Sequence, residues 1–312
     1  VSMISSSQLS LRNTSFYDSS TVALTGGTLE LGGTIGNLSS VQTDASTSLE
    51  LNSNTTISRT DPMEAGGLNL NAFSLTLGSD TTDLTINSPL VLENAASELI
   101  TQDADLVLQD SLQLNAGKIT STAGTFTFTK GGSISSILDL SGTKLKLNDN
   151  LSAQNGTLYT NSNSILHLLD NLTVTYNGEK TFKALELNGN VLTLGSASTD
   201  LRVVDELTLS SNTLYTGDAD LHLHETLTLQ NNSLLDSTGG TLKLGGTVDS
   251  SSELSIPGTS LDLITDFVIN GTLSTGAGTT ITRDTYVINP SPDLNLSGSL
   301  IKLGGDLNLA DL

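Results

Sequence analysis

Short alternations of apolar and polar residues recur along the whole chain. Between Thr199 and Ser233 the alternations are Leu-x-Leu pairs, as in "LTL" and "LHL". Their leucines fall at steps of six or seven residues, at Leu201, Leu207, Leu214, Leu221, Leu227 and Leu234. This step is too long for one helical turn, and the alternation within a pair is that of a strand with one buried face. We therefore expect each pair to form a short strand whose leucines point inward.

Three such strands make one row of roughly 20 residues. Successive rows can be written at 200–219, 220–240, 241–260, 261–280 and 281–299. Gly, Asn, Asp and Ser separate the pairs, and these residues tolerate tight turns and positive φ. One row cannot bury its leucines alone, so the rows must stack and bond strand to equivalent strand. The pattern predicts an all-β fold, a parallel β-helix: a right-handed, three-sided β-solenoid, continuous over residues 1–312.

A longer repeat overlies the rows. "LNLNAFSLTLGSDTTDLTINSPLVL" at 68–92 matches "LELNGNVLTLGSASTDLRVVDELTL" at 185–209, at a constant offset of 117 residues. We expect a first super-repeat at 66–182, a second at 183–299 and the start of a third at 300–312. Residues 1–65 carry the same kind of pattern less regularly, so we expect irregular coils there.

The ends of the chain carry no evident polar caps, which a solenoid needs to stay soluble. We therefore expect the coils to stack head to tail on further coils, either within a longer chain or on another copy of the protein.

Runs such as "LTLSSNTLYTGDADLHLHETLTLQNNSLL" resemble the β-helical repeats of large secreted bacterial surface proteins. The similar families are filamentous-haemagglutinin-like and autotransporter-passenger-like adhesins. The resemblance lies in pattern and composition over nearly the whole chain. It implies an extracellular rod that serves as a stalk or in adhesion, and it supplies no catalytic residues. The N-terminal secretion domain typical of haemagglutinin-like proteins is not recognisable.

The charge balance narrows the range of partners. The chain has 12 basic and 33 acidic residues, a net charge of −21. Nucleic acids and anionic membranes bind clustered Lys and Arg, so we expect neither as a partner. No apolar run reaches the length of about 18 residues that predicts membrane insertion. Cysteine is absent, which excludes disulfides, cysteine–zinc sites and thiol catalysis. We expect an extracellular or cell-surface protein that is stabilised by regular packing.

Two pairs of aspartates stand out as candidate ligands. Asp83 and Asp105 precede strand leucines one coil apart, and Asp200 and Asp220 repeat this arrangement in the second super-repeat. Stacking in register would hold such carboxylates about 5 Å apart. Like charges that close either raise a pKa or recruit a cation, so these four residues are a candidate metal site, with Ca²⁺ as the candidate ion. The alternative is that they are solvated acids suited to a turn.

The rest of the sequence shows no clear motif for metal binding or catalysis. His222 and His224 share one side of a strand, but their expected neighbours Arg202 and Lys243 are poor metal ligands, so we expect them to face solvent. The sequence has no nucleophile elbow, zincin motif or phosphate-binding loop. The candidate acids also recur in both super-repeats, whereas an active site is usually unique. We therefore expect no enzymatic activity and no other cofactor.

The sequence leaves three functions open. It favours a structural extracellular rod or filament segment, which predicts near-uniform corners. The alternative is an adhesin module that binds a glycan or receptor through its lateral face, which predicts an exposed patch on one side. A polysaccharide-active enzyme is the third alternative, and it would need one deep groove with convergent acids and bases.

Overall fold

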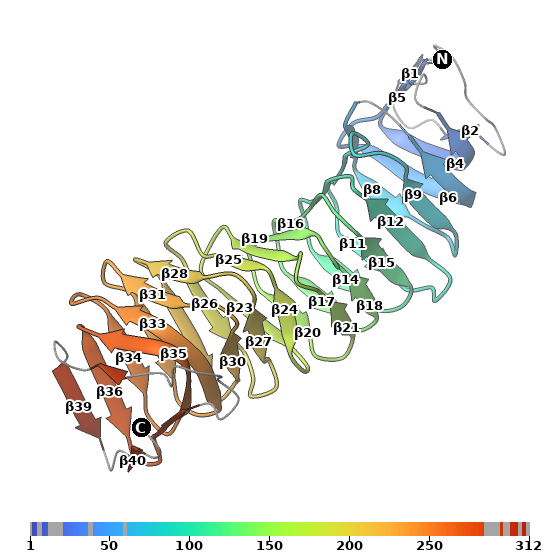
Figure 1. The fold of residues 1–312 in the computed structure, drawn as a ribbon. Helices are drawn as coiled ribbons and strands as arrows, with labels where there is room; N and C mark the ends of the chain where they lie inside the picture. The colour runs from blue at the N-terminus through green and yellow to red at the C-terminus, as the bar shows by residue number, and fades with distance from the viewer. Residues whose placement is uncertain are drawn as a thin grey trace. The chain divides into compact units, whose positions relative to one another are not determined.

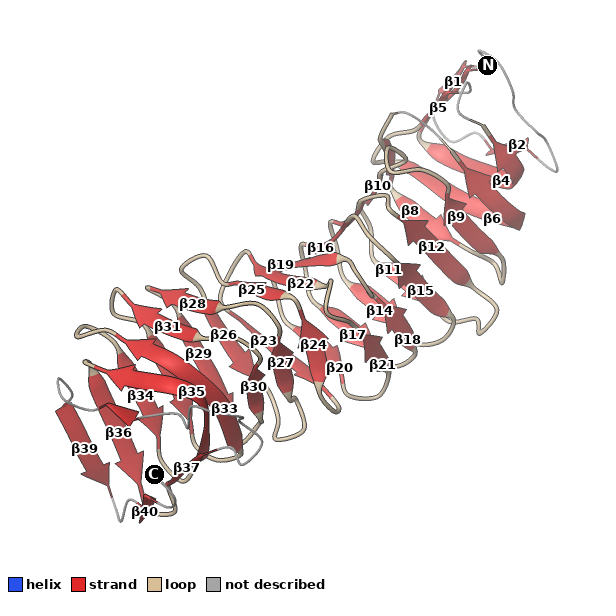
Figure 2. Cartoon of the chain, in the orientation of Figure 1, coloured by secondary structure: helices blue, strands red, loops and turns tan. Residues whose placement is uncertain are grey.

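The protein is a β-solenoid. The structure, a computed structural model, describes residues 2–4, 8–11, 21–36, 40–58, 61–283, 294–295, 300–304 and 308–309. Every regular element in these ranges is a β-strand, as Figure 2 shows. The strands pair in parallel from coil to coil, with about 20 residues per coil. The predicted fold class is therefore confirmed, while its handedness stays a prediction.

The chain forms two compact units, Val1–Thr160 and Asn161–Leu312. They run from blue to green and from yellow-green to red in Figure 1. The boundary between the units falls inside the predicted first super-repeat, at 66–182. The super-repeat is a period of the sequence, and the start of its third copy at 300–312 is described only at 300–304 and 308–309.

From β6 onward in the first unit, every third strand along the chain joins the same sheet, so each of these coils contributes one strand to each of three faces. The first sheet runs β2 (Gln8–Leu11), β4 (Gly27–Ile35), β6 (Thr47–Ile57), β9 (Ser74–Leu77), β12 (Glu98–Gln102), β15 (Lys118–Ser121), β18 (Ile137–Asp139) and β21 (Thr157–Tyr159). The second runs β7 (Met63–Ala65), β10 (Leu84–Ile86), β13 (Leu106–Leu108), β16 (Thr125–Phe128) and β19 (Lys144–Leu147). The third runs β11 (Leu90–Leu92), β14 (Leu112–Leu114), β17 (Gly132–Ile134) and β20 (Leu151–Ala153). A short sheet holds β1 (Ser2–Ile4), β3 (Thr21–Thr25) and β5 (Ser40–Gln42), and β8 (Gly67–Asn69) pairs with β6.

The second unit is built in the same way. One sheet runs β23 (Leu172–Tyr176), β26 (Val191–Leu194), β29 (Thr213–Gly217), β32 (Leu234–Ser237), β34 (Glu253–Ile256), β36 (Thr272–Gly276) and β39 (Leu300–Gly304). Another runs β24 (Lys180–Phe182), β27 (Leu201–Val203), β30 (Leu221–Leu223), β33 (Thr241–Val248), β35 (Ser260–Ile269), β37 (Thr280–Arg283) and β40 (Asn308–Leu309). The remaining pairs are β22 (Ile165–Leu168) with β25 (Ala184–Glu186), β28 (Leu207–Ser210) with β31 (Leu227–Gln230), β31 with β33, and β38 (Leu294–Asn295) with β35.

The long strand β33 turns a corner of the coil. Its first half pairs with β30 and its second half with β31. The turn requires Gly246, which has a φ of 129° and lies so close to the backbone of Leu227 that a Cβ would clash with it. Glycine at this corner therefore lets one strand serve two faces.

Leucines stacked in register fill the interior. Leu207 pairs with Leu227, and their exposed fractions are 1% and 0%. Leu214, however, pairs with Leu235, and Leu234 is only half-buried opposite Thr213.

The expectation that Leu234 points inward is therefore wrong, and corner length is the reason. Two residues separate β28 from β29, whereas three separate β31 from β32. Because side chains alternate along a strand, one extra corner residue moves the next leucine to the other side.

Buried hydroxyls tie successive coils together at the corners. Thr47 is fully buried, and its Oγ1 donates a hydrogen bond to the backbone carbonyl of Leu24 on the preceding coil, at 3.0 Å. The same contact joins Thr199 to Tyr176, Thr259 to Ser237 and Thr279 to Ile256. These bonds satisfy carbonyls at corners, where the sheet ladders end. Some of the Ser and Thr residues at the corners are thus buried and form a column of polar contacts inside the stack.

Among the described residues, each unit also has a step at which strands of successive coils do not pair. In the first unit β8 pairs with β6, and β11 is the end strand of its sheet. After β8, the Asn71 side-chain amide donates back to the carbonyl of Leu51 on β6 at 3.1 Å. The Ala72 N–H donates forward to Ser97 Oγ on the next coil at 3.2 Å.

The second unit has the matching step between β25 and β28, which no described pairing links. There the Asn188 amide donates to the carbonyl of Leu168 at 3.1 Å, and the Gly189 N–H donates to Asn212 Oδ1. Asn71 and Asn188 lie 117 residues apart and have φ values of 48° and 53°. Equivalent residues of the long repeat therefore adopt the same left-handed turn.

Candidate functional site

The predicted aspartate pairs lie at corners that precede buried strands. The N–H of Asp105 donates to Asp83 Oδ1 at 2.9 Å, and the N–H of Thr125 donates to Asp105 Oδ1 at 2.6 Å. Asp83 and Asp105 are both half-buried. The structure thus brings the first pair together in register, with each carboxylate directed at the backbone of the next coil.

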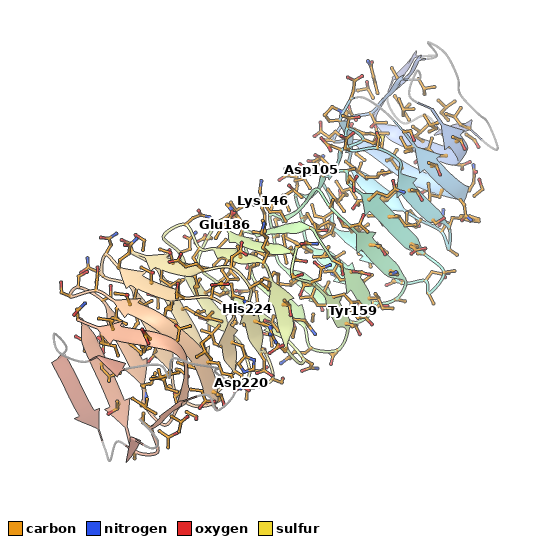
Figure 3. All side chains as sticks on the ribbon, in the orientation of Figure 1. Asp105, Lys146, Tyr159, Glu186, Asp220 and His224 are labelled. Carbon is orange, nitrogen blue, oxygen red and sulfur yellow. The ribbon has the colours of Figure 1, made fainter. Side chains whose placement is uncertain are left out.

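The second pair repeats the arrangement in the second unit (Figure 3 labels Asp105 and Asp220). The N–H of Asp220 donates to Asp200 Oδ1 at 2.9 Å, and the N–H of Thr241 donates to Asp220 Oδ1 at 2.6 Å. A charged acceptor makes a stronger hydrogen bond than a neutral one. The carboxylates therefore extend the coil-to-coil ladder past the strand end.

The same four residues were predicted as a cation site. Within the described residues, no group of three or more His, Cys, Asp or Glu side chains is placed to hold a metal ion. Each pair brings only two carboxylates together, and one oxygen of each accepts a backbone N–H. Calcium binding by Asp83, Asp105, Asp200 and Asp220 stays a prediction.

Asp44 is a further corner carboxylate, which was not among the aspartates predicted from the sequence. Its Oδ1 accepts hydrogen bonds from the hydroxyls of Ser46 and Thr47, both at 2.8 Å, and from the N–H of Gly26 at 3.2 Å. Hydrogen bonds from Ser46 and Thr47 are the main reason that the pKa of Asp44 is lowered to about 2. The signal in the sequence was "DAST", an acid followed by hydroxyl residues two and three positions later.

Asp249 belongs to the same kind of corner. Burial raises its pKa, but hydrogen bonds from Ser252, Ser251 and the Asn231 N–H outweigh this and lower it overall. Asp249 Oδ2 accepts the Asn231 N–H from the preceding coil at 3.0 Å. Corner acids in both units therefore stabilise the stack as ionised acceptors.

A row of charged residues crosses the outer surface of the second unit. Arg202 pairs with His222, His222 with Lys243, and Lys243 with Asp262, on strands β27, β30, β33 and β35. The sequence predicted Arg202 and Lys243 as the neighbours of His222, and the register confirms it. No three ligating side chains converge there.

A groove of about 410 Å³ lies on this charged row. Glu179 is an acidic residue of the groove that lies close to two of its basic side chains. His222 Nδ1 lies 2.6 Å from Glu179 Oε2, and Arg202 Nη1 lies 3.8 Å from Glu179 Oε1. His224, labelled in Figure 3, follows the end of β30. The lining residues are Glu179, Arg202, His222, Leu223, His224, Lys243 and Ile264.

A second groove, of about 600 Å³, lies in the first unit where β8 and β11 are not paired. Exposed Asn69, Asn71, Glu93 and Asn94 line it, together with Val91, which is 39% exposed. The row of Arg202, His222 and Lys243 was predicted, but neither groove was, because both grooves depend on which strands meet.

Comparison with known proteins adds no assignment. No protein-family model, no curated protein and no solved structure matches the chain. In the part of the chain that the structure describes, no helix is long and apolar enough to cross a membrane.

Proposed function

We propose that the chain is a structural segment of an extracellular β-solenoid rod or filament, part of a large secreted or cell-surface protein. The observation that carries this proposal is the recurrence of the same coil-to-coil contacts in both units. Stacked leucines, threonine hydroxyls and aspartate carboxylates each bond or pack one coil onto the next. The same types of residue thus join each coil to the next in both units.

Stacking of this kind suits a spacer. Each coil contacts only its neighbours, so length can be added without a new core. The net charge of −21 supports solubility and opposes lateral association of many copies. The corner acids recur in both units with the same backbone partners, so we assign them a structural and not a catalytic role.

The rod proposal includes head-to-tail stacking of solenoid ends. A parallel β-coil presents unpaired backbone groups to whatever follows it. Contact of one end with the other end of a second copy does not close into a ring, so it builds a filament. Most of the chain ends predicted to take part lie outside the described residues.

Sedimentation velocity over a wide concentration range, with negative-stain microscopy of the same samples, tests assembly. We expect species that grow in length at constant width as the concentration rises. Ring-shaped or laterally bundled oligomers would contradict head-to-tail stacking.

A second candidate function is an adhesin module that binds a glycan or receptor through its lateral face. The groove beside Arg202, His222 and Lys243 favours it, because it places three cationic or protonatable groups in one row of an acidic protein. The two functions are compatible, since a rod can present a site on its side.

A further inference from the structure

The charged groove of the second unit is unusual for this chain. Only 12 of the 312 residues are Lys or Arg, and 33 are acidic. Yet three successive outward positions on β27, β30 and β33 are Arg202, His222 and Lys243. Their acidic neighbours are Glu179 in the groove and Asp262, which lies opposite Lys243 on β35. Two basic side chains close together in an acidic surface can hold an anionic group at one place.

The cations of the groove are only partly neutralised within the protein. Glu179 holds His222 closely, but its oxygen is 3.8 Å from Arg202 Nη1, which is too far for a hydrogen bond. The Arg202 side chain is 46% exposed. Lys243 has no ion-pair partner among the described residues. Arg202 and Lys243 therefore remain able to bind an external anion from the two sides of His222.

The remaining lining gives the groove the features of a small-molecule site. Its volume of about 410 Å³ is within the usual range of ligand pockets. Half-buried Ile264 supplies apolar surface, while Glu179 and His224 supply hydrogen-bonding groups. A ligand with one anionic group, several hydroxyls and an apolar ring face matches this set.

We propose that this groove binds a carboxylate-bearing sugar residue of an acidic glycan. Arg202 and Lys243 hold the carboxylate, since a guanidinium offers paired N–H donors to it and an ammonium adds charge. Glu179 and His224 bond to hydroxyls, and Ile264 contacts the C–H face of the ring. A single acidic residue fits better than a polyanion, because the whole chain carries −21. This inference rests on the second candidate function, lateral binding, and is independent of the rod proposal.

The test is calorimetric titration of the whole chain at low salt with three probes. They are an oligogalacturonate trimer, the neutral galactose trimer and inorganic phosphate. We expect the acidic trimer alone to bind, and we expect R202Q and K243Q each to weaken it by about tenfold, the loss of one charge-assisted hydrogen bond. Both side chains are on the surface, so circular dichroism and melting curves should match those of the wild type.

The matched control is K118Q, which removes a half-buried lysine from a different sheet, in the first unit. It should bind the acidic trimer as the wild type does. Equal binding of the neutral and acidic trimers would overturn the acidic specificity and leave lateral glycan binding standing. Binding of phosphate as tight as that of the acidic trimer would overturn sugar recognition. No binding of any probe would overturn both this inference and the lateral-binding function at this groove, with the rod proposal unaffected.

Discussion

The carboxylate of Asp83 accepts a hydrogen bond from the backbone N–H of Asp105, one coil further along the stack, at 2.9 Å. In the reverse direction, the N–H of Leu84 donates to the backbone carbonyl of Asp105 at 3.0 Å. Side chain and backbone thus form a two-way link between the coils just before the strands begin. This relationship gives the aspartates that precede strand leucines a structural role.

Replacing Asp105 with alanine should lower the free energy of unfolding by about 1–3 kcal/mol, because the Thr125 N–H loses a charged acceptor. D105N should lose less, since its amide oxygen can still accept. The measurement is urea unfolding followed by circular dichroism. D103A is the matched control: Asp103 is exposed in the same "QDADL" stretch, and its removal should change little. Equal losses for D103A and D105A would show that the hydrogen bond does not matter.

Calcium is the test of the cation prediction for Asp83, Asp105, Asp200 and Asp220. If the four carboxylates bind calcium as predicted, the melting temperature should be higher in millimolar calcium than in chelator, because an ion bound only by the folded state stabilises it by linkage. The rise should disappear in D83N/D105N. Equal melting temperatures in calcium and in chelator would leave these residues as corner acids that accept backbone N–H groups.

Leucine substitutions test the register of the core. L235A should destabilise the protein by about 2–5 kcal/mol, whereas L234A should cost much less, because Leu235 is 0% exposed and Leu234 is half-buried. L207D should be more severe still, since it buries an unpaired charge, and T208D on the outer face should be tolerated. Thermal melting of the four variants decides the matter. A larger loss of stability for L234A than for L235A would show that Leu234, and not Leu235, is the buried leucine.

The low pKa of Asp44 predicts a pH dependence. Its folded-state pKa is about 2 against an ordinary value of 3.8, so ionised Asp44 stabilises the fold above about pH 4. That contribution is lost as the pH falls through the folded-state pKa. The difference in unfolding free energy between the wild type and D44N should therefore shrink between about pH 4 and pH 2. A difference that stays constant over this range would mean that Asp44 titrates alike in both states.

The sequence predicts the coil well because each coil obeys local rules. Alternating leucines with turn residues between them determine short strands with one buried face, and their spacing determines how many make a coil. The same spacing of about 20 residues per coil predicts that Arg202, His222 and Lys243 lie side by side on neighbouring coils. The failure at Leu234 has an equally local cause, the third corner residue between β31 and β32, and a count of leucines alone does not show which neighbour turns inward.

The candidate site is less accessible to sequence reasoning. That Asp83 and Asp105 stack could be predicted from their equal positions before strand leucines. That their carboxylates bond to backbone N–H groups could not, because it depends on how the corner directs the side chain. The groove required still more: β33 has to leave β30 to join β31, and Glu179 has to reach His222, 43 residues away.

The central claim is that the native protein is an extended rod of coils stacked along one axis. The most direct test is cryo-electron microscopy of material from the native source, with averaged images or diffraction along the long axis. We predict rods or filaments with an axial repeat near 4.8 Å, the spacing of hydrogen-bonded strands. Compact particles without that repeat, or fibres whose strands run along the axis, would contradict the claim.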